Sequence, residues 1–229
     1  MFAHTCRLVF ATAIALTAPA ARADEVDVGK VPEAARKAAD AAIATKTGLK
    51  NVKWTTAERY TEATVVTYNL EGETPDEYGA AVTVTAGGVV EAASEEIDFV
   101  KLPAAVLKAV RTAVPGLKED EAVVLRCLSG KGLADVSFEI EAEDAKSRYV
   151  WLDSAPDGTI DEFYTEVTLK DLPKQVLDAV NKMFPKRKSA TCYAVQVKGK
   201  LARYDIDVVR GNDSELSVSF TPVGRLIKD

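Results

Sequence analysis

The stretch LPKQVLDAVNKMFP, residues 172–185, decides the fold of this chain because a related stretch occurs twice upstream. Residues 102–115 read LPAAVLKAVRTAVP, and VPEAA at residues 31–35 opens a weaker first copy. The prolines at the second position of these stretches are 71 and 70 residues apart (103 − 32 and 173 − 103). Self-similarity at a fixed period indicates a repeat architecture. We therefore predict three related units.

Each stretch is predicted to form a helix that starts at its proline, where the missing N–H would be unpaired anyway. In the first copy we expect the helix from about Pro32 to Lys46, ending before Gly48. Apolar residues recur at the spacing i, i+3, i+4, i+7 and i+8, which is one face of a helix. The predicted inward positions are Ala35, Ala38, Ala39, Ala42 and Ile43, then Val106, Ala109, Val110, Ala113 and Val114, then Val176, Ala179, Val180, Met183 and Phe184.

After each helix, apolar and polar residues alternate, which is typical of strands with one buried face. Glycine-containing turns then indicate hairpins. We therefore predict an α+β fold made of tandem repeats, each with one helix packed on an antiparallel sheet of about four strands. The matched inward strand positions are Val66, Tyr68 and Leu70, then Val136, Phe138 and Ile140, then Tyr204, Ile206 and Val208, and the turn glycines are Gly88, Gly158 and Gly224.

The N-terminus has the pattern of a signal peptide. Arg7 precedes an apolar run at residues 8–18, and Ala21-Arg22-Ala23 fits the small-x-small cleavage motif. The run is shorter than the roughly 20 residues that span a bilayer. We predict a signal peptide at residues 1–23, a mobile lead-in at residues 24–30, and a periplasmic or secreted mature chain. The predicted repeats are residues 24–100, 101–170 and 171–229.

Charge and composition exclude several classes of function. Removing the predicted signal takes two basic residues away, so the formal net charge changes from −6 to about −8. Such a chain, without a basic cluster, argues against nucleic acid or an anionic membrane as a partner. The single histidine is His4, inside the predicted signal. Histidine-dependent nucleophiles and histidine-ligated zinc are therefore excluded, and we expect no catalytic residues, no metal and no cofactor.

Residues 153–161 partly resemble a calcium loop of the EF-hand type. Ala155 stands at the third ligand position, and Tyr164 stands at the twelfth, where a bidentate Glu is needed. The flanking residues alternate like strands rather than helices. We therefore interpret this segment as a hairpin turn.

The Leu-Pro-x-x-Val pattern with an Ala-Val pair and a closing Pro, at residues 102–115 and 172–185, resembles the PepSY-like domain. It is also similar to the β-lactamase-inhibitor-like domains of exported bacterial proteins. The resemblance covers copies two and three well and copy one weakly. It implies a helix on a curved antiparallel sheet and a role in protein binding, with peptidase inhibition the usual conjecture. It brings no shared catalytic residues.

Two classes of function follow. The favoured hypothesis is an exported, non-enzymatic protein-binding module, such as an inhibitor or regulator of a peptidase or another envelope enzyme. The alternatives are a small-ligand sensor, an envelope structural protein, or a hydrolase that uses carboxylates. With 35 Asp and Glu residues in the chain, neighbouring carboxylates arise by chance, which disfavours the hydrolase.

Cys127 and Cys192 remain after the predicted cleavage. An exported protein permits a disulfide between them, and closing a loop of 65 residues (192 − 127) would stabilise the fold by roughly 4 kcal/mol. Aligning the copies, however, matches Cys192 with Val124 and not with Cys127. Because Cys127 is an odd number of residues beyond Val124, the side chains of Cys127 and Cys192 are expected to point to opposite faces of their strands. The sequence leaves a disulfide and two free thiols as alternatives.

Tyr149 and Trp151 are the predicted binding residues. Alignment on the turn glycines places them on the outward face of their strand, where copy three has Glu215 and Ser217. Outward aromatic residues are the types that anchor protein interfaces. The alternative is that another unit of the same chain covers them, so that they belong to a core between repeats.

Overall fold

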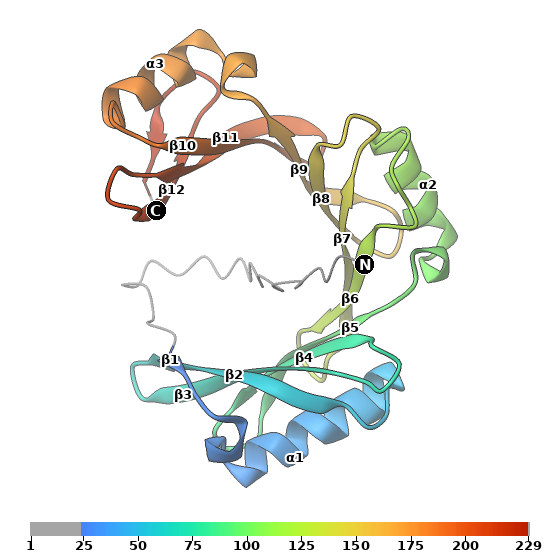
Figure 1. Cartoon of the computed structure of the whole chain (residues 1–229). Helices are drawn as coiled ribbons and strands as arrows, with labels where there is room; N and C mark the ends of the chain where they lie inside the picture. The colour runs from blue at the N-terminus through green and yellow to red at the C-terminus, as the bar shows by residue number, and fades with distance from the viewer. Residues whose placement is uncertain (1–23, 229) are drawn as a thin grey trace.

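The computed structural model of the chain describes residues 24–228 (Figure 1). The predicted signal peptide, residues 1–23, lies outside the described residues. Residues 24–228 form three α-helices, and short 3-10 or π turns flank them. The helices are α1 (Glu33–Ala42), α2 (Ala104–Ala113) and α3 (Lys174–Met183), and the turns are η1 (Val28–Lys30), η2 (Ile43–Thr47), η3 (Phe99–Lys101) and η4 (Leu169–Asp171).

The strands dominate the described part of the chain. They are β1 (Asp24–Glu25), β2 (Lys53–Glu62), β3 (Val65–Glu73), β4 (Gly79–Thr85), β5 (Val90–Glu96), β6 (Val123–Ser129), β7 (Asp135–Glu143), β8 (Tyr149–Ser154), β9 (Ile160–Val167), β10 (Ser189–Val197), β11 (Lys200–Val209), β12 (Glu215–Phe220) and β13 (Leu226–Ile227). The prediction that residues 24–30 are mobile is wrong, because this segment forms the strand β1 and the turn η1.

The predicted fold class, tandem repeats of one helix on an antiparallel sheet of about four strands, is wrong. The strands form one 13-stranded antiparallel sheet in chain order, β1 to β13. The last strand of each predicted repeat, which would otherwise be an edge of its sheet, pairs with the first strand of the next repeat. β5 pairs with β6, with Ala93 opposite Leu128, and β9 pairs with β10, with Val167 opposite Cys192. This pairing provides hydrogen bonds for backbone groups that a free edge would expose. The alternation of residues within one strand gives no sign of it, because backbone groups are the same in every residue.

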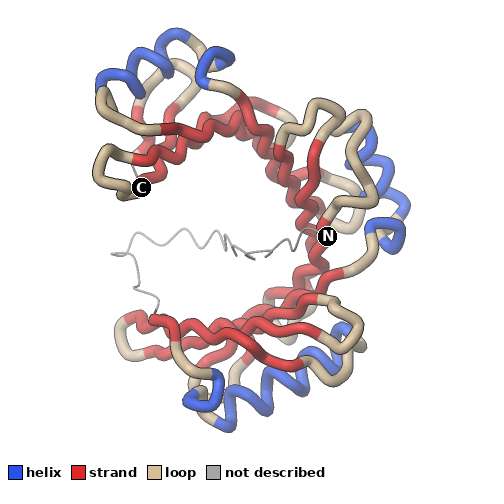
Figure 2. Tube along the Cα trace, in the orientation of Figure 1, coloured by secondary structure: helices blue, strands red, loops and turns tan. Residues whose placement is uncertain are grey.

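The sheet curves, and all three helices lie on its outer, convex side (Figures 1 and 2). We call the opposite surface of the sheet, which carries none of the helices of residues 24–228, the inner face. β1 and β12 lie on the same side of the molecule, across the open side of the arc (Figure 1). No helix among residues 24–228 is long and apolar enough to cross a membrane.

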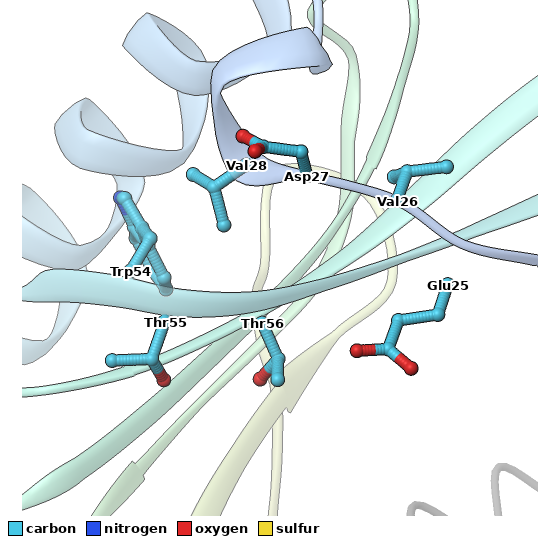
Figure 3. Close-up of a pocket in the computed structure, with 7 residues that line it drawn as sticks. All are labelled: Glu25, Val26, Asp27, Val28, Trp54, Thr55 and Thr56. Atoms are coloured by element: carbon cyan, nitrogen blue, oxygen red, sulfur yellow. The ribbon is translucent and has the colours of Figure 1, made fainter.

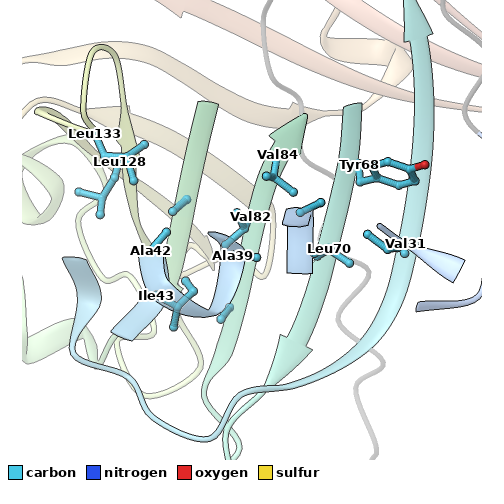
Figure 4. Packing of buried hydrophobic residues seen from close by; sticks show 14 residues of the cluster. Val31, Ala39, Ala42, Ile43, Tyr68, Leu70, Val82, Val84, Leu128 and Leu133 are labelled. Atoms are coloured by element: carbon cyan, nitrogen blue, oxygen red, sulfur yellow. The ribbon is translucent and has the colours of Figure 1, made fainter. Parts of the chain in front are cut away.

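Each helix covers its own hydrophobic cluster on the outer side of the sheet. Under α1, small residues such as Ala35 and Ala39 pack against Leu70 and Val82 (Figure 4). Val106 of α2 and the predicted inward residue Phe138, which is 4% exposed, belong to the second cluster. Most predicted inward positions are confirmed as buried or half-buried. Met183 is an exception at 42% exposed, because α3 ends there.

The turn glycines bring each hairpin against a helix. Gly158, between β8 and β9, has φ +86°, and a Cβ there would lie 2.6 Å from the carbonyl oxygen of Ala105 in α2. Gly224 would meet the carbonyl oxygen of Gln175 in α3 at 2.5 Å, and Gly88 would meet that of Ala34 in α1 at 3.1 Å. A side chain is therefore excluded for two reasons, backbone angle and space.

Candidate functional site

The two predicted binding residues lie on the inner face. On β8, Tyr149 and Trp151 alternate with Val150 and Leu152, which are 1% and 0% exposed and belong to the cluster under α2. Because successive side chains of a strand point to opposite faces, Tyr149 and Trp151 point away from that helix. Both are half-buried.

Each of these aromatic side chains contacts a tyrosine from a neighbouring segment. The rings of Trp151 and Tyr164, on β9, have centroids 5.1 Å apart at an interplanar angle of 84°. The rings of Tyr149 and Tyr193, on β10, are 6.1 Å apart at 73°. Edge-to-face pairs of this kind are favourable because the positive edge of one ring meets the negative face of the other. The Tyr149–Tyr193 contact crosses the predicted boundary between repeats two and three, so part of the patch packs within the chain.

We call the rings of Tyr149, Trp151, Tyr164 and Tyr193 the aromatic patch. Arg203, on β11, lies next to this patch. Its guanidinium carbon lies 5.6 Å from the centroid of the Tyr164 ring, and Nη2 donates to the Tyr164 hydroxyl. Nη1 pairs with Glu162 at 3.2 Å, and Nε pairs with Asp205 at 3.0 Å. An arginine is thus held by one aromatic face and two carboxylates, a combination that suits guanidinium groups.

Carboxylates form a row beside the aromatic patch. Glu139 on β7 is directly opposite Asp153 on β8, and Asp153 is directly opposite Glu162 on β9. Glu141 lies two residues along β7 and is opposite Trp151. Like charges directly opposite one another destabilise a sheet, so this arrangement costs stability in the unliganded chain.

The acidity of these carboxyl groups reflects their surroundings. Burial raises the pKa of Glu139 to about 7, and the charge of Asp153 adds to the effect. Burial also raises the pKa values of Glu141 and Asp153, although Tyr149 and Ser137, respectively, donate hydrogen bonds that act in the opposite direction. Burial disfavours the charged form of a carboxyl group. The groups are therefore held in an environment that lacks compensating positive charge.

The two cysteines do not form a disulfide, and both thiols are free. Of the two alternatives that the sequence leaves open, the disulfide is therefore wrong. Cys127 lies on β6 and Cys192 on β10, four strand spacings apart in the sheet, which is about 19 Å and far beyond disulfide reach. They also point to opposite faces, because Cys192 belongs to the cluster under α3 while Cys127 neighbours Glu139. Burial raises the pKa of both thiols, that of Cys192 to about 11, so neither has the character of a reactive thiolate.

The segment at residues 153–161 forms the hairpin turn between β8 and β9. Gly158 N donates to Ala155 O at 2.9 Å, and Ala155 N donates to Thr159 O at 2.9 Å. Within residues 24–228, no group of three or more Cys, Asp, Glu or His side chains has the arrangement of a metal site.

Two pockets lie away from the aromatic patch. One, of about 440 Å³, is lined by residues 25–28 and 54–56 (Figure 3). Trp54 in its wall donates a hydrogen bond from Nε1 to Asp40 of α1, at 2.7 Å. The other, of about 530 Å³, lies beside the end of α3 and includes Arg187 and Lys188. Neither gathers several convergent polar groups around an apolar interior, which is the usual form of a small-ligand site.

Sequence reasoning found Tyr149 and Trp151 but missed the residues that surround them. Tyr164, Tyr193, Arg203 and Glu139 come from four other strands. The alternation within β9 and β11 places Tyr164 and Arg203 on the uncovered side. What the sequence did not reveal is that β9 pairs with β10, and this pairing brings them together.

No family model matches the chain, and no curated protein matches it. The PepSY-like resemblance therefore stays a hypothesis. Among solved structures, the chain is similar to a crystal structure from Bacteroides eggerthii described as one of the "putative periplasmic proteins", with 18% sequence identity and a TM-score of 0.43. The similarity covers 55% of this chain and 86% of the Bacteroides chain.

Proposed function

We propose that the mature chain is an exported, non-enzymatic protein-binding module, periplasmic or secreted, that uses the inner face of its sheet. The observation that carries this proposal is the aromatic patch, defined as Tyr149, Trp151, Tyr164 and Tyr193. Its members lie on the side of the sheet that none of the described helices α1, α2 and α3 covers, while the other side has three hydrophobic clusters under these helices.

The partial exposure of the patch supports this role. Trp151 and Tyr149 are half-buried, so the packing with Tyr164 and Tyr193 holds each ring in place and leaves part of it accessible. Rigid aromatic side chains provide contact area at a low cost in conformational entropy, and Trp and Tyr are the residues most enriched among binding hot spots. Regulation of a peptidase or of another envelope enzyme is the form of this function that the family resemblance implies.

The experiment compares the two tryptophans of the chain. The mature protein, Trp151→Ala and Trp54→Ala are immobilised and exposed to an envelope extract of the source organism. Trp54 is the matched control because its indole contacts α1 on the outer side. We expect a stoichiometric protein partner that Trp54→Ala retains and that Trp151→Ala binds more weakly by about 2 kcal/mol or more.

Folding stability must be measured alongside binding. An exposed Trp151 would contribute less than about 0.5 kcal/mol to folding, and a core residue about 3–5 kcal/mol. Because Trp151 is half-buried against Tyr164, we expect a value between these limits. If Trp151→Ala loses about as much stability as a core variant and still recovers the partner at wild-type levels, the patch is not the binding site. Turnover of a substrate that one Asp or Glu substitution abolishes would instead support an enzyme.

A further inference from the structure

The centre of the inner face carries more negative than positive charge. Five carboxylates from three adjacent strands share it, namely Glu139 and Glu141 of β7, Asp153 of β8, and Glu162 and Glu166 of β9. Across residues 24–228, no lysine or arginine forms an ion pair with Glu139, Glu141 or Asp153. Arg203 reaches this area, but Glu162 and Asp205 already neutralise it.

Buried polar atoms without partners lie on the same face. Asp153 Oδ1 is shielded from solvent and accepts no hydrogen bond. Ser94 is 2% exposed, and its hydroxyl also has no hydrogen-bond partner. Ser94 on β5 is opposite Cys127 on β6, which is opposite Ser137 on β7, and this line of residues reaches the carboxylates at Ser137, two residues before Glu139. Buried polar groups are nearly always paired, and unpaired ones call for an explanation.

The chain itself shows how this face holds a cation. The guanidinium of Arg203 lies over the Tyr164 ring while Glu162 and Asp205 pair with its nitrogens. Trp151 and Glu141 offer the same combination of a ring and a carboxylate on neighbouring strands. No lysine or arginine of the described chain pairs with Glu141.

We propose that the centre of the inner face binds lysine and arginine side chains on a basic surface of the protein partner. The carboxylate row would pair with the cations, and Trp151 would provide a ring for one of them. This inference rests on the proposed function and specifies the chemistry of the partner. Charge complementarity carries it: an incoming cation would offset the repulsion between Glu139 and Asp153, with which no lysine or arginine of residues 24–228 forms an ion pair.

The test uses Trp151 as the reporter. The chain has two tryptophans, so Trp54→Phe leaves Trp151 as the only indole. This protein is titrated with a short arginine-only peptide, while a glutamate-only peptide and a glycine–serine peptide serve as probes of opposite and zero charge. We expect the arginine peptide to change the Trp151 emission in a saturable manner, and the other two peptides to leave it unchanged.

Two double variants separate a specific site from general attraction to an acidic protein. The titrations are made at pH 8, above the raised pKa of Glu139, so that Glu139→Gln with Asp153→Asn removes two charges from the inner face. Glu33→Gln with Asp178→Asn removes two exposed charges from α1 and α3 on the outer side. We expect the inner-face variant to bind the arginine peptide about tenfold more weakly and the helix variant to change its affinity by less than about twofold. Circular dichroism spectra of both variants serve as the control that they are folded.

Several results would overturn the inference. Equal loss of affinity in the two double variants would show that only net charge matters, and an unchanged Trp151 emission would show that the peptide does not reach the inner face. The proposed function can be tested separately with the captured partner. If its binding is weakened by Trp151→Ala but not by the inner-face charge variant, the module binds a protein, but not through basic side chains.

Discussion

Glu139→Gln is expected to remove a large part of the dependence of folding stability on pH. In the folded protein the pKa of Glu139 is raised from 4.5 to about 7, chiefly by burial. Leu125 lies directly opposite Glu139 on β6, and the titratable groups that act on Glu139 are Asp153 on β8, Cys127 on β6 and Glu141 on its own strand. None of them is a cation.

The sign of the effect follows from proton linkage. Between pH 4.5 and about 7 the folded state binds more protons at Glu139 than the unfolded state does, so the free energy of unfolding falls as the pH rises. The stabilisation is complete below about pH 4.5 and is lost as the pH passes through 7. At about 1.4 kcal/mol for each pKa unit, the loss is on the order of 3 kcal/mol.

Glutamine has nearly the same shape as glutamate and carries no charge. In Glu139→Gln, residue 139 should therefore no longer contribute to the difference in the free energy of unfolding between pH 5 and pH 8. We expect the variant to match the wild type at pH 5 and to exceed its stability at pH 8 by up to about 3 kcal/mol. The assay is urea denaturation followed by circular dichroism at pH 5, 6, 7 and 8.

The matched control is Glu33→Gln, because Glu33 lies on α1 in an exposed pair with Lys37. It should change stability by less than about 0.5 kcal/mol at every pH. Parallel pH profiles for Glu139→Gln and the wild type between pH 5 and pH 8 would refute the reasoning. They would mean that Glu139 ionises as readily in the folded protein as in the unfolded chain.

Three further predictions concern the packing. Phe138→Ala should cost about 3–5 kcal/mol in urea denaturation, because Phe138 is buried under α2, and a loss below about 0.5 kcal/mol would mean that its side chain is not in the core. Gly158→Ala should lower stability by about 2–4 kcal/mol through its positive φ and the contact with Ala105. Gly132→Ala, with a similar φ but open space, should cost only about 1 kcal/mol, and equal losses would dismiss the contact. Arg126→Met should cost about 3 kcal/mol by leaving Glu95, 5% exposed, without its ion pair. Adding Glu95→Leu should restore much of that loss, and no recovery in the double variant would contradict this.

The sequence predicted the local structure well because local structure depends on patterns within one segment. The proline at the start of each helix, the alternation around Phe138 and the turn at Gly158 all correspond to features of the structure. The sheet was predicted wrongly because pairing between strands depends on backbone groups that every residue carries. Nothing in the side chains of β5 and β6 shows that Ala93 lies opposite Leu128.

The candidate site was predicted only in part for the same reason. Tyr149 and Trp151 are aromatic where the matching positions of the other copies are small or polar, so a comparison of the copies reveals them. The role of Glu139 depends on Asp153 lying directly opposite, and that of Arg203 depends on Tyr164 two strands away. Such residues look like ordinary surface charges until the register of the sheet is known.

The order of the strands also bears on how the chain folds. Every strand pairs with the strands that precede and follow it in the sequence, from β1 to β13. A chain that emerges from its N-terminus can therefore add each hairpin to a sheet edge that is already in place, and no late segment has to insert between earlier ones. Each strand pairing closes only a short loop or a single helix-containing connection, which favours rapid formation. We expect folding to proceed during emergence, with the most recent strand serving as the template for the next.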